Sequence, residues 1–146
     1  MTNRILVIDD QQDIADALVR LLKTMKYGAR AIYDGKQAEA VAIDYLPHLA
    51  FIDISMPGFD GYQTVAKIRA NRQCAHVVLV ALTGHADQEY KRRAYDAGYD
   101  LFVTKPMSVD TLKEVLTVID PNDAELPARD VAHRLAEGWK HVAHVS

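Results

Sequence analysis

Strand-like apolar segments alternate along the chain with stretches in which apolar residues recur at helical spacing. The strand-like segments lie at 4–9, 28–33, 48–53, 76–82 and 99–103. Short runs that are almost continuously apolar are typical of strands buried on both faces of a sheet. The longest of them, Val77–Leu82, is far too short to span a membrane. We therefore predict five buried strands.

Helical spacing follows each of these segments. After the first, apolar residues recur at i, i+4, i+7, i+8 and i+11, namely Ile14, Leu18, Leu21, Leu22 and Met25. The later helices are predicted to begin at residues that can cap a helix, which are Asp34, Asp60, Asp87 and Ser108. Five strands that alternate with five helices predict an α/β fold, a parallel sheet covered on both faces.

The 146 residues fit one domain, which we place at 1–120, followed by a C-terminal tail at 121–146. The tail contains no strand-like run and is too short for an independent effector domain. Val131, Leu135 and Trp139 follow Pro127 at helical spacing and can form a short amphipathic helix. We expect the tail to be partly helical or flexible, and frayed or loosely docked rather than a second folded unit.

Composition narrows the functional class. The net charge of −3 argues against a nucleic-acid-binding surface. The single cysteine, Cys74, excludes an internal disulfide and fits a reducing compartment. The N-terminal residues lead into only four apolar residues, too few for the core of a signal peptide. We expect a cytoplasmic protein that contacts neither nucleic acid nor membrane.

Polar side chains end four of the five predicted strands. Asp9 and Asp10 follow the first strand, Asp53 ends the third, Thr83 the fourth and Lys105 the fifth. Right-handed crossovers place the C-terminal ends of parallel strands at one edge of the sheet, where ligands bind in open α/β folds. We therefore expect these five side chains to form one site.

The residue types at this edge suit phosphoryl transfer. Three clustered carboxylates repel one another unless a cation joins them, and Mg²⁺ is bound in this way by one or two carboxylates and several waters. Beside such an ion, the carboxylate of Asp53 can attack phosphorus to give an acyl phosphate. Lys105, as a cation, and Thr83, as a hydroxyl donor, can hold the phosphoryl oxygens.

Each residue also has a structural interpretation when it is taken alone. Asp9 and Asp10 are suited to helix capping, and Asp53 to solvating a strand end. Thr83 fits a turn, and Lys105 fits an exposed position. Their joint occurrence at four strand ends favours a functional site.

Four segments make the chain resemble a response-regulator receiver domain of two-component signalling (CheY-like) over 4–119. The resemblance implies a flavodoxin-like, doubly wound five-stranded parallel sheet in the order 2-1-3-4-5, and a stand-alone single-domain regulator. The matching segments are ILVIDD at Ile5–Asp10, DISMPGFDGY at Asp53–Tyr62, VALTG at Val80–Gly84 and AGYDLFVTKP at Ala97–Pro106.

The resemblance implies a phosphoacceptor and a metal site. Asp53 is then the phosphoacceptor, and Asp10 binds Mg²⁺ (or Mn²⁺) directly. Asp9 helps to place the ion, largely through water, and the backbone carbonyl of Ser55 completes the protein ligands together with Asp53. Ser55 and His85 occupy the two positions that control access of water to the acyl phosphate.

By the same resemblance, Thr83 and Lys105 contact the phosphoryl group, and Thr83 and Phe102 form the switch. Phe102 stands where other members carry tyrosine. It lacks the hydroxyl, so the burial of its ring, and not a hydrogen bond, can report whether the switch is on. As an ordinary strand aromatic, Phe102 has a purely structural interpretation too. The peptide bond before Pro106 is expected to be cis.

The resemblance implies a phosphorylation-dependent switch. A histidine kinase or a histidine phosphotransfer protein would phosphorylate Asp53, and a downstream protein would dock on the surface formed by the fourth helix, the fifth strand and the fifth helix. Such a protein is not an enzyme, because it catalyses only its own aspartyl phosphorylation and dephosphorylation. Lys91, Arg92 and Arg93 lie on or near this surface, and equally fit a solvated helix face.

Three alternatives compete with this hypothesis. Aspartate-nucleophile phosphatases of the haloacid-dehalogenase type carry a second aspartate two residues after the nucleophile, where this chain has Ser55. A phosphorylation-independent scaffold would be expected to lack an acidic residue or the lysine, and all are present. A receiver module of a hybrid histidine kinase or phosphorelay remains the main alternative to a stand-alone regulator.

Overall fold

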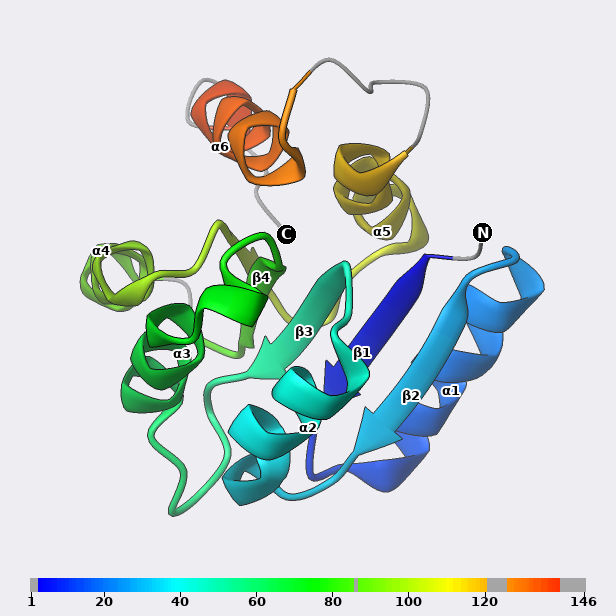
Figure 1. Ribbon diagram of the computed structural model, residues 1–146, viewed down its shortest axis with the longest axis horizontal. Coiled ribbons are helices and arrows are strands. Elements are labelled where there is room, and N and C mark those ends of the chain that lie inside the picture. Colours follow the sequence, from blue (N-terminus) through cyan, green and yellow to red (C-terminus); the bar gives the residue numbers. More distant parts are fainter. Residues whose placement is uncertain (1–2, 86, 121–125, 140–146) are drawn as a thin grey trace.

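A computed structural model of the chain shows five parallel strands in one sheet, with helices on both faces (Figure 1). The structure describes residues 3–85, 87–120 and 126–139. The strand order is β2-β1-β3-β4-β5, which confirms the expected flavodoxin-like topology. The strands are β1 (Arg4–Ile8), β2 (Gly28–Ile32), β3 (Leu49–Asp53), β4 (Val78–Thr83) and β5 (Leu101–Thr104).

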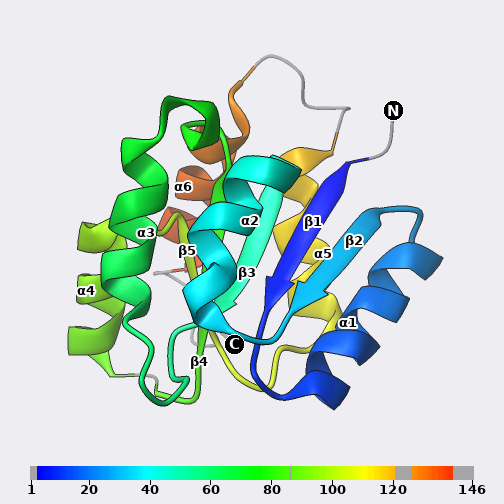
Figure 2. The same cartoon turned by 60° about the horizontal axis from the view of Figure 1, so that its bottom comes forward.

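The helices form two layers, one on each face of the sheet (Figure 2). Helices α1, α5 and α6 share a hydrophobic core with one face, and α2, α3 and α4 share a second core with the other. Short 3₁₀ turns lie at Gly35–Gln37 (η1), Arg72–Cys74 (η2) and Thr117–Ile119 (η3). The α-helices are α1 (Gln12–Thr24), α2 (Ala38–Tyr45), α3 (Gly61–Ala70), α4 (Gln88–Ala97), α5 (Val109–Leu116) and α6 (Ala128–Trp139).

Side-chain caps fix three of the predicted helix starts. The Asp60 carboxylate accepts hydrogen bonds from the backbone at the start of α3, and Asp87 and Ser108 do the same for α4 and α5. Asp34 caps the 3₁₀ turn η1 that precedes α2. Each cap satisfies backbone N–H groups that have no partner within their helix.

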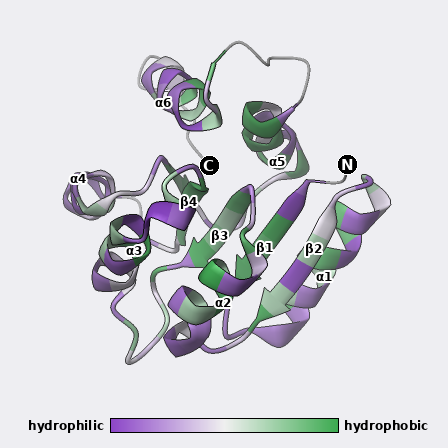
Figure 3. Cartoon of the chain, in the orientation of Figure 1, coloured by the Kyte–Doolittle hydropathy of each residue, from purple (hydrophilic) through white to green (hydrophobic). Residues whose placement is uncertain are grey.

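Burial follows the predicted pattern. All residues of β3 and β4 are buried, as expected for central strands covered on both faces. In β5, Leu101 and Val103 face the core of α1, α5 and α6, whereas Phe102 faces the opposite core. Figure 3 shows the apolar strands at the centre and polar residues on the outer sides of the helices. No helix in the described ranges is long and apolar enough to cross a membrane.

The C-terminal segment contains the helix that was expected, but this helix packs more closely on the domain than expected. Residues 128–139 form α6, the helix that the spacing of Val131, Leu135 and Trp139 allowed. Ala132 and Trp139 are buried in the core shared with α1 and α5. The expectation of a frayed or loosely docked tail is therefore wrong for these residues. The remainder of the tail, 121–125 and 140–146, lies outside the described residues, and the domain boundary after 120 stays a prediction.

Candidate functional site

The strand register brings the predicted site residues to one edge of the sheet. Ile8 of β1 pairs with Ile52 of β3, so the residues that follow them, Asp9 and Asp53, leave neighbouring strands at the same level. Asp53 in turn pairs with Leu82 of β4. The common edge is therefore a consequence of parallel topology.

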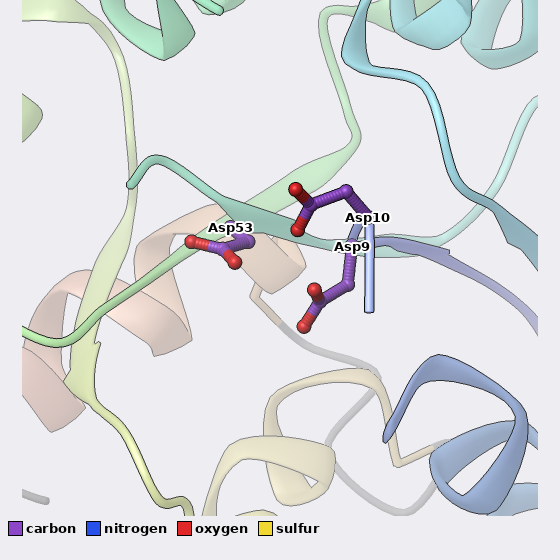
Figure 4. Close-up of side chains that lie close together, drawn as sticks. All are labelled: Asp9, Asp10 and Asp53. Atoms are coloured by element: carbon purple, nitrogen blue, oxygen red, sulfur yellow. The ribbon is translucent and has the colours of Figure 1, made fainter. Parts of the chain in front are cut away.

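Three carboxylates share this edge (Figure 4). Asp9 and Asp53 are almost fully buried, with 1% and 4% of their surface exposed, whereas Asp10 is exposed. One oxygen from each lies within 4.8 Å of the others. We call Asp9, Asp10 and Asp53 the carboxylate cluster.

Lys105 is held against this cluster. Its Nζ donates to Asp9 Oδ2 at 3.0 Å and to Asp53 Oδ2 at 3.1 Å. Its backbone N–H donates to the carbonyl of Thr83, and the bond to Pro106 is cis, as predicted. Burial lowers the pKa of Lys105, but hydrogen bonds to both carboxylates and their charges outweigh it, so the pKa is raised. Lys105 therefore stays protonated.

The charges at this edge do not balance. Three carboxylates carry −3. Among the described residues, Lys105 is the one cation paired with them and carries +1, which leaves −2. Unbalanced charge at buried carboxylates is unfavourable unless a cation binds. Carboxylate oxygens are the ligands that Mg²⁺ prefers, and the exposed Asp10 leaves room for its waters. The donor set therefore fits a hard divalent cation.

Ser55 fixes the orientation of the Asp53 carboxylate. Asp53 Oδ1 accepts a hydrogen bond from the Ser55 backbone N–H at 2.8 Å and from its hydroxyl at 2.6 Å. Asp53 Oδ2 faces Lys105 instead. The sequence predicted a metal-binding carbonyl and a position controlling water access for Ser55, but not the hydrogen bond from its hydroxyl to Asp53. A serine two residues after an aspartate is a recognisable local hydrogen-bonding pattern, so the signal was present.

Thr83 and Phe102 occupy different depths. Thr83 is buried at the end of β4, and its Oγ1 accepts a hydrogen bond from the backbone of His85 at 3.1 Å. Phe102 is 2% exposed and lies deeper, in the core beside α4. In the same region, burial raises the pKa of Tyr95 to about 12, although a backbone hydrogen bond at Phe102 lowers it. The structure thus places Thr83 at the edge and Phe102 behind it.

An apolar hollow of about 470 Å³ opens beside the carboxylate cluster. Its polar lining residues are Asp9, Gln11 and Lys105. Helix α1 contributes Ile14, which is 48% exposed although it is a large apolar residue. An apolar hollow with few polar groups is typical of a binding surface. Sequence reasoning placed Ile14 on the inner face of the first helix and did not find this hollow.

Comparisons with known proteins agree with this architecture. The model of the response regulator receiver domain matches residues 5–117. The phosphate regulon transcriptional regulatory protein PhoB of Pseudomonas aeruginosa is 28% identical over 127 residues, which are 84% of this chain and 56% of that protein. The DNA-binding dual master transcriptional regulator RpaA of Synechocystis is 29% identical over 109 residues, 75% of this chain and 45% of that protein. The chain thus spans about half the length of these relatives.

Solved structures share the fold. A CheY-like receiver domain protein from Methanospirillum hungatei has a TM-score of 0.77 at 24% identity, covering 86% of this chain and 100% of that one. The chemotaxis protein CheY4 of Vibrio cholerae has a TM-score of 0.75 at 24% identity, covering 80% and 98%. With the family model covering most of the sequence, the chain belongs to the response regulator receiver domains, the signalling modules of two-component systems.

Proposed function

We propose that this receiver is a phosphorylation-dependent switch in which Asp53 accepts a phosphoryl group with Mg²⁺ bound at the carboxylate cluster. The uncompensated charge of −2 around a buried, oriented aspartate is the observation that carries the proposal. Asp9, Asp10, Asp53 and the backbone carbonyl of Ser55 would hold the ion. When bound, it would neutralise charge on the transferring phosphoryl group.

The contacts of Asp53 support different tasks for its two oxygens. Oδ1 already accepts two hydrogen bonds from Ser55, so Oδ2 is the nucleophile. The new bond joins Oδ2 to phosphorus, while the bond from phosphorus to the donor's histidine nitrogen breaks and its electron pair stays on that nitrogen. Lys105, now within 3.1 Å of Oδ2, then pairs with a phosphoryl oxygen.

Thr83 would sense the phosphoryl group. Its Oγ1 already accepts from the backbone of His85, which leaves the hydroxyl hydrogen free to donate to a phosphoryl oxygen. Movement of Thr83 toward the site would change the packing of β4 against β5, where Phe102 lies. A shift between two such packings is a change of population within one fold.

The partners follow from this chemistry. A histidine kinase or histidine phosphotransfer protein would donate the phosphoryl group by docking over the apolar hollow beside the carboxylate cluster, where Ile14 is exposed. A downstream protein would dock on the surface of α4, β5 and α5. We place the protein in the cytoplasm without a nucleic-acid contact of its own, either as a stand-alone regulator or as the receiver module of a hybrid kinase or phosphorelay.

Intact-mass measurement after incubation with acetyl phosphate tests the proposal. Wild type and Asp13→Asn, which changes an exposed aspartate of α1, should each gain one phosphoryl group only when Mg²⁺ is present. Asp53→Asn should gain none. A folded, Mg²⁺-binding wild type that gains no phosphoryl group would contradict the proposal and favour a phosphorylation-independent scaffold.

A further inference from the structure

Helix α6 covers part of the surface that the proposed downstream partner would use. It contacts β5, β4 and η3, and its buried residues Ala132 and Trp139 join the core of α1 and α5 (Figure 1). The indole N–H of Trp139 donates to Oε2 of Glu114 on α5 at 2.9 Å. We call the surface under α6, from Asp100 at the start of β5 to Glu114 on α5, the α6 seat.

The two carboxylate oxygens of Asp100 accept hydrogen bonds from different parts of the molecule, one from the receiver and one from α6. Oδ2 accepts from the backbone of Leu79 at 2.9 Å and from Arg69, both inside the receiver. Oδ1 accepts from Arg129 Nε at 2.9 Å, and His133 Nε2 donates to it at 2.7 Å, because an ionised carboxylate only accepts. One oxygen therefore holds the domain together, and the other holds α6.

This division makes α6 separable from the fold. If α6 left, Asp100 would keep both contacts to Oδ2, so the receiver would retain its internal ion pair. The two donors from α6 lie at the rim, with 33% of the Arg129 and 52% of the His133 side chain exposed, whereas Asp100 has no exposure. Water can reach both of these donors, so replacing their contacts by water is easier than replacing that of Arg69, whose side chain is 13% exposed.

The seat is covered only in part. A hollow of about 370 Å³ separates α6 from the end of α4, lined by Tyr95 and Tyr99 on one side and by His133 and Ala136 on the other. Helix α6 thus occupies β5 and α5 but does not close against α4. A partner can approach along α4 before α6 moves.

We propose that α6 is a releasable occupant of the α6 seat, and that the downstream partner binds there with a helix that imitates α6. Oδ1 of Asp100 is buried and would be left without its donors, so the incoming helix must present an arginine to it. An aromatic side chain ten residues further along, about 15 Å on a helix, would replace Trp139. The proposal refines the docking surface named above and stands without phosphorylation of Asp53.

The fluorescence of Trp139, the single tryptophan, reports the position of α6 directly. In the 146-residue chain with Arg129→Ala, and more so with His133→Ala added, the emission should shift to longer wavelength and acrylamide should quench it more strongly. Arg134→Ala removes the same charge from an exposed position of α6 and should leave both signals unchanged. Circular dichroism should show that all variants keep the receiver fold. Unchanged protection of Trp139 in the double variant would overturn the proposal.

A labelled peptide of residues 126–139 tests whether the seat accepts a helix from outside. It should bind the Arg129→Ala/His133→Ala chain about tenfold more tightly than wild type, because apparent affinity scales with the fraction of open molecules. The same peptide with Arg129→Glu should lose this advantage. Equal binding to both chains would overturn the proposal. So would a wild-type dimer in sedimentation that Arg129→Ala dissociates, because α6 would then belong to a second copy.

Discussion

Two buried aspartates at opposite edges of the sheet show opposite charge balances. Asp53 ends β3, shares Lys105 with Asp9, and lies in a cluster with the exposed Asp10. Asp100 lies just before β5 and is surrounded by an excess of donors, namely Arg69, Arg129, His133 and the backbone N–H of Leu79. Both carboxylates are nearly or fully buried, at 4% and 0% exposure.

The comparison separates a ligand site from a structural ion cluster. Burial and conspicuous charge are common to both, so neither identifies function. The difference is whether the surrounding side chains neutralise the carboxylates. Where they do, the cluster holds elements together; where they do not, a missing cation is implied. Replacing the buried aspartate by asparagine should therefore have opposite effects on stability at the two edges.

The largest effect is expected from Asp100→Asn. This change leaves the guanidinium of Arg69, whose side chain is 13% exposed, without its carboxylate. Removing one partner of a buried ion pair costs about 3–5 kcal/mol of unfolding free energy. Urea unfolding followed by circular dichroism measures the loss. Asp96→Asn, an exposed aspartate of α4, serves as the control and should change little. A loss of similar size in both variants would contradict the structural role of Asp100.

A smaller loss, about 2 kcal/mol, is expected from Lys105→Met in Mg²⁺-free buffer at pH 8, because Asp9 and Asp53 lose their shared cation. Added Mg²⁺ should restore more stability to this variant than to wild type, since the ion takes over the neutralising role. Urea unfolding with and without Mg²⁺ measures both effects. Equal responses to Mg²⁺ would show that Lys105 and the ion do not share the cluster.

The difference in unfolding free energy between wild type and Lys105→Met should also depend on pH. The pKa of Lys105 is raised in the folded state above its ordinary 10.5. Its contribution is therefore fully present below pH 10.5 and is lost as the pH rises through the folded value. The stability gap between wild type and Lys105→Met should be constant near pH 8 and narrow at high pH. The half-buried Tyr95 and the buried Tyr99 are present in both proteins, so their titration cancels when the difference is taken.

Asp53→Asn should stabilise the folded protein, whereas Asp100→Asn should destabilise it. The substitution removes one buried negative charge that repels Asp9 and Asp10 and that, among the described residues, forms an ion pair with Lys105 alone. We expect the unfolding free energy in Mg²⁺-free buffer to rise by about 1 kcal/mol, the scale of one such repulsion near water. Urea unfolding of Asp53→Asn beside Asp100→Asn compares the same chemical change at the two edges. Destabilisation by both substitutions would contradict the claim that Asp53, unlike Asp100, lies in an excess of negative charge.

The smallest effect is expected from Ser55→Ala. Its hydroxyl donates to Asp53 at 2.6 Å, but Ser55 is exposed and its backbone N–H keeps a second bond to the same oxygen. A loss of about 0.5 kcal/mol is expected in the same unfolding measurement. Ser55→Thr keeps the hydroxyl and should match wild type. A loss well above that of Lys105→Met would mean that Ser55, not Lys105, is the main support of Asp53.

Much of the fold and site follows from local patterns. Almost continuously apolar segments predicted all five strands, and the caps at Asp60, Asp87 and Ser108 predicted three helix starts. Parallel topology then brought Asp53 and Lys105 to one edge, because the C-terminal ends of parallel strands all lie at the same edge of the sheet. These features depend on nearby residues or on topology, which the sequence pattern carries.

The Asp100 cluster and the docking of α6 could not be predicted in the same way. Arg69, Asp100 and Arg129 are separated by about thirty residues each, and their contact depends on how the ends of α3, β5 and α6 meet. The helical spacing around Trp139 indicated that α6 can form, but the charged partners that dock it appear only in three dimensions. The sequence therefore predicted the helix better than its location.

The most direct test of the charge imbalance is the effect of Mg²⁺ on the urea unfolding of wild type, Asp10→Asn and Asp13→Asn. Both substitutions remove an exposed aspartate near the start of α1, but only Asp10 belongs to the carboxylate cluster. At a Mg²⁺ concentration about a hundredfold above its Kd, wild type and Asp13→Asn should each gain about 2.7 kcal/mol, and Asp10→Asn far less. An equal gain in all three proteins, or none in wild type, would contradict the account.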